Sequence, residues 1–528
     1  MSRQEASELA MREKEWQAKF DVAYDLLTVS DCTQCRLLKV PSRDYYAKKL
    51  GQALLENDHI TDLQLNSTRW SSVGAIKDIE RFLQSTTSLK KFHLRDSYSN
   101  PMTARLLSFA AGNKHIKEIR VTCGNPARNP SAVLDLLKAV PENALTSLCL
   151  MSLTAVLPVD ADEEAKANVD DNATKIAKSI RAQKNLRSLT LVKPLPPLLD
   201  GLFGGLAAAA AAAAAADSNQ TSPLQEIHLD GMLQGIDVNS FADFLASEAS
   251  QNVTHLIFEN FTIGENADFT TKLVRSICDN SSISSLSFKD CATNQTTNFM
   301  DLLYGNTHIK AISVEDTNPE RFGIIDDVLG WIPMMPSISK FHMKISAKNL
   351  HVLYGIKAVI RRIASTGLKD ISMGFIYDRA HDAEYIELGY TKDLFELVDF
   401  LESNETFEKI SMVITGFDAV ISHRDLTRLP FRGARNKLAR LLREEGSTLP
   451  KVMGAIADWC EKGQQQQQEK AITRHEMENR LVTLVFLSLR DQPSFLSPYS
   501  QAIMSHVKND EKMSCARKRT CRKRKHRS

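Results

Sequence analysis

Cys32 and Cys35 form the first residue pair in this chain whose spacing suggests chemistry. Two cysteines separated by two residues can bind zinc or cycle between a dithiol and a disulfide. A structural zinc site needs four ligands, however, and no second cysteine pair follows at a finger-like distance. A redox pair of the thioredoxin type would follow a strand and open a helix, which the surrounding sequence does not indicate. We therefore predict neither a metal nor a redox cofactor at this pair.

A second candidate set combines two histidines with three carboxylates, and imidazole and carboxylate groups are common ligands of divalent metals. If the two segments that carry them lie on neighbouring strands, the two histidines stand roughly 8 Å apart. Nothing in the sequence enforces a ligand geometry, so we expect a solvated surface cluster without a metal. The set comprises Glu226, His228, Asp230, His255 and Glu259.

Sequence signatures of catalysis are absent. The chain contains no Walker A sequence, no Gly-x-Gly-x-x-Gly, no His-Glu-x-x-His and no Gly-x-Ser-x-Gly. Cys149 has no evident base among its expected neighbours, Arg120 and Thr190. We therefore predict that the chain is not an enzyme, and a pocket with convergent polar groups and strongly shifted pKa values would overturn that prediction.

The last residues of the chain, 517–528, contain eight Lys and Arg residues and no acid. Without these eight cations the net charge of +2 becomes −6, so a mildly acidic body ends in a basic tail. Such runs are typical of nuclear-import signals and of arms that contact nucleic-acid phosphates, and no aromatic residue interleaves here for base stacking. The candidate import residues are Arg517, Lys518, Arg519, Arg522, Lys523, Arg524 and Lys525.

Other features indicate a cytoplasmic or nuclear protein without a membrane span. The N-terminal segment lacks the apolar core of a signal peptide, and the nine scattered cysteines favour reduced thiols. The uncharged run at 201–216 ends in ten alanines but is shorter than the roughly 20 residues that cross a bilayer. Because alanine is the best helix former, we expect an enlarged connecting helix there.

The elements that position all these residues follow from a repeat. A hexad of the form apolar, two variable residues, apolar, one variable residue, apolar recurs twelve times, with 26 to 41 residues between successive starts. Self-similarity at this period predicts a stacked repeat architecture. The hexads begin at Ile60, Leu89, Ile116, Leu145, Leu186, Leu224, Val253, Ile283, Ile309, Ile338, Leu368 and Phe407.

Each hexad is followed by a stretch with helical periodicity, such as the one containing Phe241, Phe244 and Leu245. Polar turn-forming sequences such as GNKHI, DNSSI and GNTHI lead into the next hexad. A single strand–helix unit cannot bury its own apolar face, so the units must stack side by side. The first, fourth and sixth hexad positions are then predicted to form one core between an inner parallel sheet and outer helices.

Hexads such as LKKFHL, IKEIRV, LTSLCL and LRSLTL resemble those of the leucine-rich repeat family, in its long, ribonuclease-inhibitor-like form. The resemblance implies an α/β solenoid, a curved horseshoe with a concave parallel sheet and outer helices. The chain departs from the family at the ninth position, where Asn or Cys is usual. Side chains that could substitute there are Thr68, Ser97, Cys291, Thr317, Ser346 and Thr415, whereas Gly124, Leu153, Pro194, Met232, Phe261 and Ile376 mostly cannot.

Four regions are predicted. Residues 1–56 form an N-terminal helical cap and residues 57–424 form the solenoid of about 12 repeats. Residues 425–505 form a helical C-terminal region, and residues 506–528 form a disordered tail. Long gaps between hexads predict insertions at 153–175, 193–222 and 375–393.

The third and fifth hexad positions point away from the core and are polar, mixed in charge and free of aromatic residues. Repeats two and three carry a basic patch that Glu118 moderates, made of Lys90, Lys91, Arg95, Lys117 and Arg120. The candidate partner-binding residues on this face are Lys91, His93, Arg120, Glu226, His228, His255 and His342.

The first hypothesis for function is a non-enzymatic scaffold or adaptor that binds a protein partner whose identity the sequence does not give. The alternative is a nuclear, nucleic-acid-associated regulator that uses the basic tail, with an import receptor as a further partner.

Overall fold

The computed structural model describes fourteen main segments and scattered single residues between 18 and 458. By compactness the chain divides into two units, residues 1–367 and residues 368–528, and each unit is described separately. The segments are 34–37, 44–67, 73–96, 101–124, 130–142, 144–151, 163–215, 222–231, 239–263, 267–293, 306–317, 335–346, 368–376 and 397–415, the last without 402–405.

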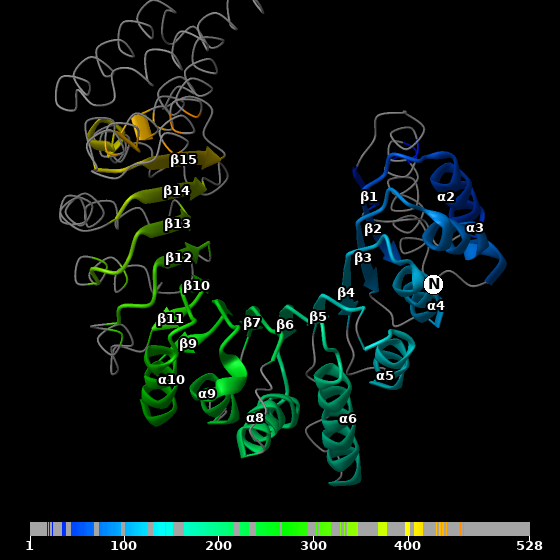
Figure 1. Cartoon of the computed structure of the whole chain (residues 1–528), viewed down its shortest axis with the longest axis horizontal. Helices are drawn as coiled ribbons and strands as arrows, with labels where there is room; N and C mark the ends of the chain where they lie inside the picture. The colour runs from blue at the N-terminus through cyan, green and yellow to red at the C-terminus, as the bar shows by residue number, and fades with distance from the viewer. Residues whose placement is uncertain are drawn as a thin grey trace, which may run out of the picture. The chain divides into compact units, whose positions relative to one another are not determined.

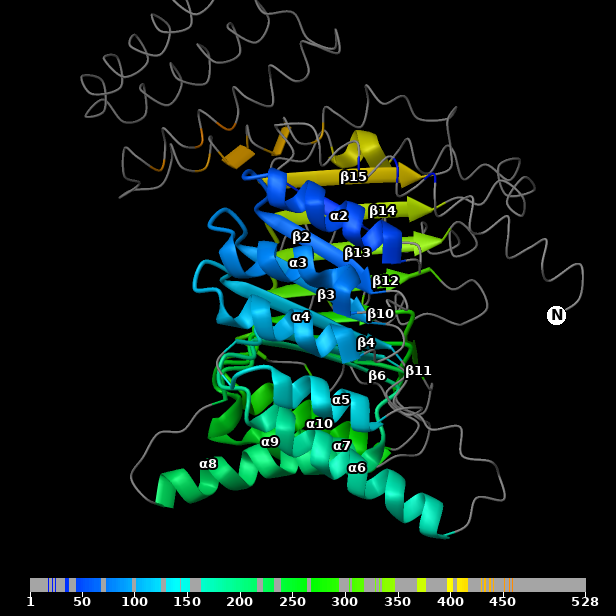
Figure 2. The same cartoon turned by 90° about the vertical axis from the view of Figure 1, so that its right-hand side faces the viewer.

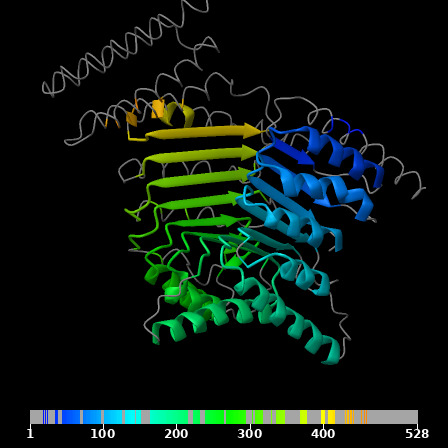
Figure 3. The same cartoon turned by 45° about the vertical axis from the view of Figure 1, so that its right-hand side comes forward.

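The strands of the first unit pair in parallel, and their spatial order is their order in the sequence (Figure 1). Figure 3 shows them as successive rungs of one sheet. The strands are β1 (Gln34–Leu37), β2 (Asp62–Ser67), β3 (Lys91–Asp96), β4 (Glu118–Gly124), β5 (Ser147–Met151), β6 (Ser188–Val192), β7 (Glu226–Asp230), β8 (His255–Glu259), β10 (Ser285–Lys289), β12 (Ala311–Asp316) and β13 (Lys340–Ser346).

The described helices lie between successive strands from β1 to β10 and together lie on one side of the sheet of the first unit (Figure 1). Figure 2 shows α2, α3 and α4 stacked in chain order over the strands that precede or follow them. The helices are α2 (Asp44–Glu56), α3 (Val73–Ser85), α4 (Pro101–Gly112), α5 (Pro130–Ala139), α6 (Glu163–Arg181), α7 (Pro196–Leu199), α8 (Gly205–Ala215), α9 (Asn239–Ala246) and α10 (Ala267–Asp279).

The hexads form the core, as predicted. Every first, fourth and sixth hexad residue is buried, as Leu89, Phe92 and Leu94 illustrate in the second repeat. The third and fifth positions between them remain partly or fully exposed, which is the alternation expected of a strand with one buried face. The predicted parallel sheet and the α/β solenoid are therefore confirmed.

A buried asparagine three residues before several hexads ties each repeat to the one before it. The Oδ1 atom of Asn280 accepts hydrogen bonds from the backbone N–H groups of Ser282 and Ile283, at 3.0 and 3.2 Å. Its Nδ2 group donates to the carbonyl of Leu245 in the preceding repeat, at 2.9 Å. Because buried backbone groups need partners, this side chain lets the chain turn from helix to strand inside the core. Asn57, Asn113 and Asn306 accept backbone bonds in the same way.

Left-handed turn residues end the strands of repeats five to eight. Their φ angles are 49° at Lys193, 64° at Gly231, 53° at Asn260 and 47° at Asp290. Each backbone N–H donates to a carbonyl of the next repeat, as Lys193 does to Asp230 at 2.6 Å. A short second sheet follows, in which β9 (Thr262–Ile263) pairs with β11 (Ala292–Thr293).

At the ninth position, where leucine-rich repeats usually carry Asn or Cys, Cys291 bonds backbone as predicted. Its thiol donates to the backbone carbonyl of Phe258 in the preceding repeat, at 3.3 Å. Burial raises the pKa of Cys291 to about 12, so the side chain is a neutral thiol at physiological pH. Thr317 instead donates its hydroxyl to the Asp290 carboxylate at 2.9 Å. Both contacts join neighbouring repeats, so Thr317 makes an inter-repeat contact where Asn or Cys is usual.

The register shifts by two residues between β4 and β5, contrary to the prediction that the fifth positions of these hexads are neighbours. Arg120 lies opposite Ser147, and Thr122 lies opposite Cys149. The Thr146 hydroxyl accepts from the N–H of Ile119 at 3.1 Å and donates to its carbonyl at 3.0 Å. Since side chains alternate with period two, this shift keeps every side chain on its predicted face.

The alanine-rich insertion is helical, as predicted. Residues Pro196–Ala215 form one helical stretch in which a π-helical turn, Asp200–Gly204, joins α7 to α8. By length and composition alone this stretch could cross a membrane, although one such helix is weak evidence. Phe203 is fully buried and packs against Phe241 and Phe244, with ring centroids 4.8 and 5.1 Å apart. These contacts place the stretch in the outer helical layer of the repeats.

The N-terminal region contains a strand that the predicted helical cap does not include. Residues 34–37 form β1, which pairs with β2 and places Cys35 opposite Leu63. Cys35 therefore lies inside a strand rather than at the start of a helix, while Cys32 lies outside the described residues. Within the predicted helical cap, residues Asp44–Glu56 do form a helix, α2.

In the second unit, β14 (Asp370–Ile376) pairs in parallel with β15 (Lys409–Thr415). Its two hexads bury the predicted positions, including Ile371 and Ile410. The Nδ2 group of Asn436 donates to the carbonyl of Phe407 at 2.8 Å. The predicted C-terminal helices in 425–505 fall mostly outside the described residues, and the tail at 506–528 falls wholly outside them.

Candidate partner-binding face

The side of the first unit's sheet that lies opposite the helices is its open face. It carries the third, fifth and seventh hexad positions, which alternate with buried residues. The sequence analysis assigned only the third and fifth positions to this face. The same alternation with period two also assigns the seventh position to it. In the charged repeats this additional column consists of Arg95, Asp230, Glu259, Lys289, Glu315 and Lys344.

The basic block of the open face consists of Lys91, Arg95 and Arg120 on β3 and β4, with Glu118 among them. The Lys91 ammonium lies 3.3 Å from the Glu118 carboxylate, which also pairs with Arg120. Burial raises the pKa of Glu118, but its bonds to Arg120 and Lys91 outweigh burial and leave the pKa below its usual value. Glu118 is therefore an anion that offsets part of the positive charge of the block.

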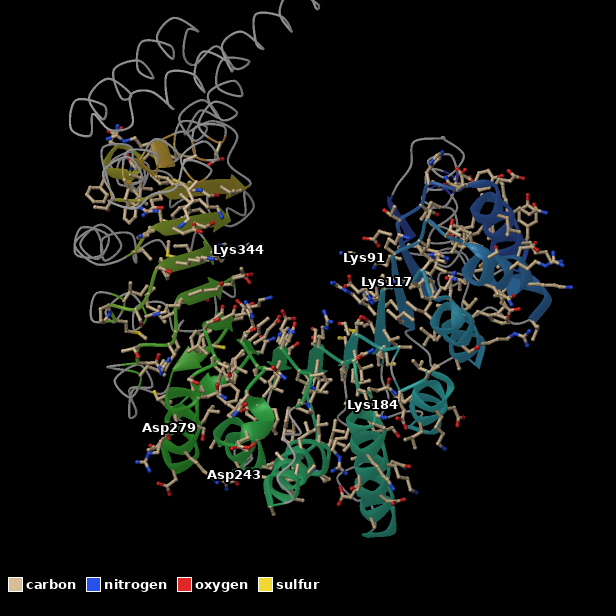
Figure 4. The ribbon with its side chains drawn as sticks, viewed as in Figure 1. Lys91, Lys117, Lys184, Asp243, Asp279 and Lys344 are labelled. Carbon is tan, nitrogen blue, oxygen red and sulfur yellow. The ribbon has the colours of Figure 1, made fainter. Side chains whose placement is uncertain are left out.

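Lys90 and Lys117 were predicted to belong to this patch, but each turns toward its own loop. The Lys90 ammonium donates to the carbonyl of Thr87 at 2.7 Å, and the Lys117 ammonium donates to that of Lys114 at 2.9 Å. Both residues precede their strands, so they border the basic block. Figure 4 shows Lys91 and Lys117 on the strand side of the repeats, and Asp243 and Asp279 on the helix side.

His93 lies between the basic residues and is partly buried. Its Nε2 atom is 3.0 Å from the hydroxyl of Thr122 on the neighbouring strand. Burial, together with the nearby charges of Arg120 and Arg95, lowers the pKa of His93. The histidine is therefore a neutral member of the block at physiological pH.

The neutral waist of the open face lies on β5 and β6 and consists of Ser147, Cys149, Ser188 and Thr190. These side chains are small, uncharged and half-buried. Burial raises the pKa of Cys149 to about 11, so the group is a thiol rather than a nucleophilic thiolate. The described groups that act on its pKa besides burial are Arg95, Thr122 and Asp230.

Cys149 should consequently react slowly with iodoacetamide at pH 7.5. A pKa of about 11 in place of 9.0 leaves about 100-fold less thiolate at that pH. Peptide mass spectrometry after timed alkylation would measure the rate, with the guanidinium-unfolded chain as the fully reactive control. A rate in the folded protein equal to that of the unfolded chain would contradict the burial of this thiol.

The acidic block of the open face consists of Glu226, Asp230 and Glu259 on β7 and β8. His228 Nε2 lies 2.8 Å from the Glu259 carboxylate. The hydroxyl of Ser188 donates to Glu226 at 2.9 Å, across the boundary with the neutral waist. Burial lowers the pKa of His228, whereas Glu259 acts in the opposite direction, and the net shift is downward.

His255 lies opposite Glu226 in the register, and His228 lies opposite Ile257. The predicted cluster therefore lies on adjacent strands, and its two histidines are not directly opposite each other in the register. His255 is exposed, with its Nδ1 atom 2.7 Å from the hydroxyl of Thr254. In the part of the chain that the structure describes, no three His, Cys, Asp or Glu side chains are placed to share a metal ion.

His342 is the predicted partner-binding residue that lies apart from both blocks. It occupies the fifth position of β13, opposite Ser313 of β12. Beside it, the Lys344 ammonium lies 3.9 Å from the Glu315 carboxylate. The seven predicted residues therefore fall into three places on the face rather than into one site.

The first unit should lose stability as the pH falls from 7.5 to 5.5. The folded-state pKa values of His93 and His228 lie below the ordinary value, so the unfolded chain binds protons more readily over this range. The stabilisation is present above the unfolded pKa of about 6.5 and declines below it. Denaturant titrations at both pH values should show a smaller pH effect in His93→Gln than in the natural chain. An equal pH effect in both proteins would exclude His93 as a contributor.

Comparison with known proteins gives no close relative. No protein-family model matches the chain, and no curated protein matches it. The structure of TLR13 in complex with ssRNA13 is 11% identical with a TM-score of 0.30, and the match covers 71% of this chain but only 46% of that one. A leucine-rich repeat protein of Leptospira interrogans is 10% identical with a TM-score of 0.25, with coverage of 76% of this chain and 89% of that protein.

Both likenesses are too distant to carry an argument about function, so the fold assignment rests on the chain's own geometry. The hexads bury their first, fourth and sixth residues without exception, and their strands pair in parallel in chain order. Helices lie outside this sheet and connect its strands (Figure 1). The chain therefore has an α/β solenoid fold of the leucine-rich repeat type.

Proposed function

We propose that this protein is a non-enzymatic scaffold that binds a protein partner through the open face of its first unit. The observation that carries the proposal is the open face itself. Its strands present alternating polar side chains, and the described helices of the unit lie on the other side of the sheet (Figure 1). Side chains on this face are not part of the hydrophobic core, so they are available to contact a partner.

The composition of the face favours recognition by charge and shape. None of its described third, fifth and seventh positions is aromatic, and aromatic residues are the commonest strong anchors of protein interfaces. Charged groups contribute mainly to specificity and association rate. We therefore infer a partner that matches the charges of the face.

Affinity purification with quantitative mass spectrometry tests the proposal. The full chain would be compared with a Lys91→Glu, Arg120→Glu variant. The matched control is Asp243→Lys with Lys272→Glu, which exchanges the charges of an ion pair of 2.8 Å on the outer helices. We expect the face variant to lose specific partners that the control retains. Equal recovery of every partner by both variants would refute binding through the open face.

A second candidate function is that of a nuclear, nucleic-acid-associated regulator. The eight Lys and Arg residues of 517–528 favour it, since such runs serve as import signals or phosphate-binding arms. Deletion of 515–528 should then abolish nuclear accumulation and salt-sensitive retention on nucleic acid. Retention and location that do not change on deletion would eliminate this candidate.

A further inference from the structure

Charge is segregated along the part of the open face that runs from β3 to β8. On the flanking strands the charges mix, since Asp62 lies opposite Lys91 and Lys289 lies opposite Glu259. The open-face positions of β3 and β4 include three cations and one carboxylate: Lys91, Arg95, Arg120 and Glu118. Those of β7 and β8 include three carboxylates and no Lys or Arg: Glu226, Asp230 and Glu259. Between them, β5 and β6 present no charged residue at these positions.

We propose that this bipolar surface binds one α-helix of a partner protein whose charges are segregated in the same manner. The acidic end of the helix lies over the basic block, its uncharged middle lies over the neutral waist, and its basic end lies over the acidic block. This inference rests on the proposed scaffold function and adds the chemistry and the conformation of the ligand.

The backbone of the face explains why the ligand is a helix. Each strand from β3 to β8 pairs with a neighbour on both sides, so its backbone N–H and C=O groups are already used. An added strand would find no free sheet edge there, whereas a helix satisfies its own backbone groups. Recognition must then come from side chains.

The dimensions of the surface give the length of the ligand. Neighbouring strands lie about 4.8 Å apart, so the centre of the basic block is about 19 Å from the centre of the acidic block, four strand spacings away. A helix rises about 1.5 Å per residue and covers that distance in about 13 residues. The small side chains of Ser147, Ser188 and Thr190 at the neutral waist allow the middle of such a helix to approach the sheet.

The same arrangement disfavours a nucleic acid as the ligand of this face. A phosphate backbone would be attracted by the basic block but repelled by the three carboxylates of the acidic block. Acidic residues near a helix N-terminus and basic residues near its C-terminus also stabilise the helix through its dipole. A charge-segregated segment is therefore well suited to be helical before it binds.

Fluorescence anisotropy with two labelled peptides of 18 residues tests the inference on the full chain. One peptide carries four Glu in its first turns, an alanine-rich middle and four Lys in its last turns. The other has the same composition with Glu and Lys intermixed. At low salt we expect the segregated peptide to bind at least about tenfold more tightly, and added salt to weaken its binding. Equal affinities would overturn the inference.

Charge-reversal variants make the test specific to the two blocks. One triple variant reverses the basic block: Lys91→Glu, Arg95→Glu, Arg120→Glu. A second reverses the acidic block: Glu226→Lys, Asp230→Lys, Glu259→Lys. We expect each to weaken binding of the segregated peptide at least about tenfold. The combined six-residue variant should recover binding, because the peptide can then lie in the opposite direction. Glu226→Gln, Asp230→Asn, Glu259→Gln is a milder second variant if the reversal prevents folding, and Asp243→Lys with Lys272→Glu is the helix-side control.

Other ligands of the open face would give different results in these experiments. Binding of an 18-base-pair DNA duplex that competes with the peptide and does not change when the acidic block is reversed would overturn the inference. Self-association in sedimentation experiments that either block reversal abolishes would identify a second copy of the chain as the occupant instead. If the open face captures partners while segregated and intermixed peptides bind equally, only this inference fails and the proposed function stands.

Discussion

Replacing Phe288 with alanine should lower the free energy of unfolding of the first unit by about 3–5 kcal/mol, as expected for a buried phenylalanine. Phe288 occupies the sixth position of its hexad and is fully buried. Its ring stacks on that of Phe258 in the preceding repeat, with centroids 6.0 Å apart. Truncation would remove this contact between repeats and leave a cavity. Guanidinium titration followed by circular dichroism would measure the change.

Ser287 is the matched control, because it is the adjacent residue on the same strand and points to the open face. Ser287→Ala should change the free energy of unfolding by no more than about 0.5 kcal/mol. Equal effects of the two substitutions would contradict the assignment of alternating faces. The pair thus tests the hexad pattern itself, because these two adjacent residues of one strand point to opposite faces of the sheet.

Replacing Asn280 with alanine should cost about 2–3 kcal/mol of stability, because several buried groups lose their partner at once. The residue is 8% exposed, and its amide nitrogen donates both to the carbonyl of Leu245 and to the hydroxyl of Ser250, at 2.9 and 2.7 Å. Its oxygen accepts from two backbone N–H groups at the start of the next strand. Thermal and denaturant unfolding would both report the loss.

Asn280→Asp separates the two roles of the side chain. Aspartate keeps the accepting oxygen but replaces the donating nitrogen with an oxygen that faces the carbonyl of Leu245, so we expect it to be at least as destabilising as alanine. Ser281→Ala, at the exposed neighbouring position, should have little effect. Stability that survives both changes at Asn280 would show that this asparagine does not tie the repeats together.

The core and the strand order could be predicted from the sequence because both depend on a local pattern. The apolar residues of a hexad, such as Ile283, Leu286 and Phe288, specify which face of the strand is buried. Helical spacing likewise predicts the buried face of α9, including Phe241 and Phe244. Repetition then determines the order of the strands in the sheet, because each repeat packs on the next one along the chain.

Contacts between repeats could not be predicted in this way. At the two-residue shift between β4 and β5, the hydroxyl of Thr146 bonds the backbone of Ile119 in another repeat. No periodicity encodes that contact. The turn asparagines were visible in GNKHI, DNSSI and GNTHI, but their bonds to the preceding repeat, such as Asn113 Nδ2 to the Leu83 carbonyl at 2.8 Å, require the fold.

The face on which the candidate residues lie, and most of their grouping into two charged sets, could be predicted from the sequence. Lys91, Arg120 and Glu226 lie on the predicted face, since a period of two suffices to place them. Asp230 and Glu259 were also predicted to group with Glu226 on adjacent strands, as the register confirms. The sequence did not predict that Lys90 and Lys117 turn toward their own loops. The segregation of charge becomes visible when the third, fifth and seventh positions of successive strands are read together.

Site-specific photo-crosslinking tests most directly whether the open face binds the partner. A photoreactive amino acid would replace Thr190, on the neutral waist, and separately Arg275, an exposed residue of α10 on the helix side. Both proteins would be irradiated in cells and their crosslinked species compared by mass. We predict a discrete crosslinked partner from position 190 and none from position 275. Crosslinks that arise only from position 275 would contradict recognition through the open face.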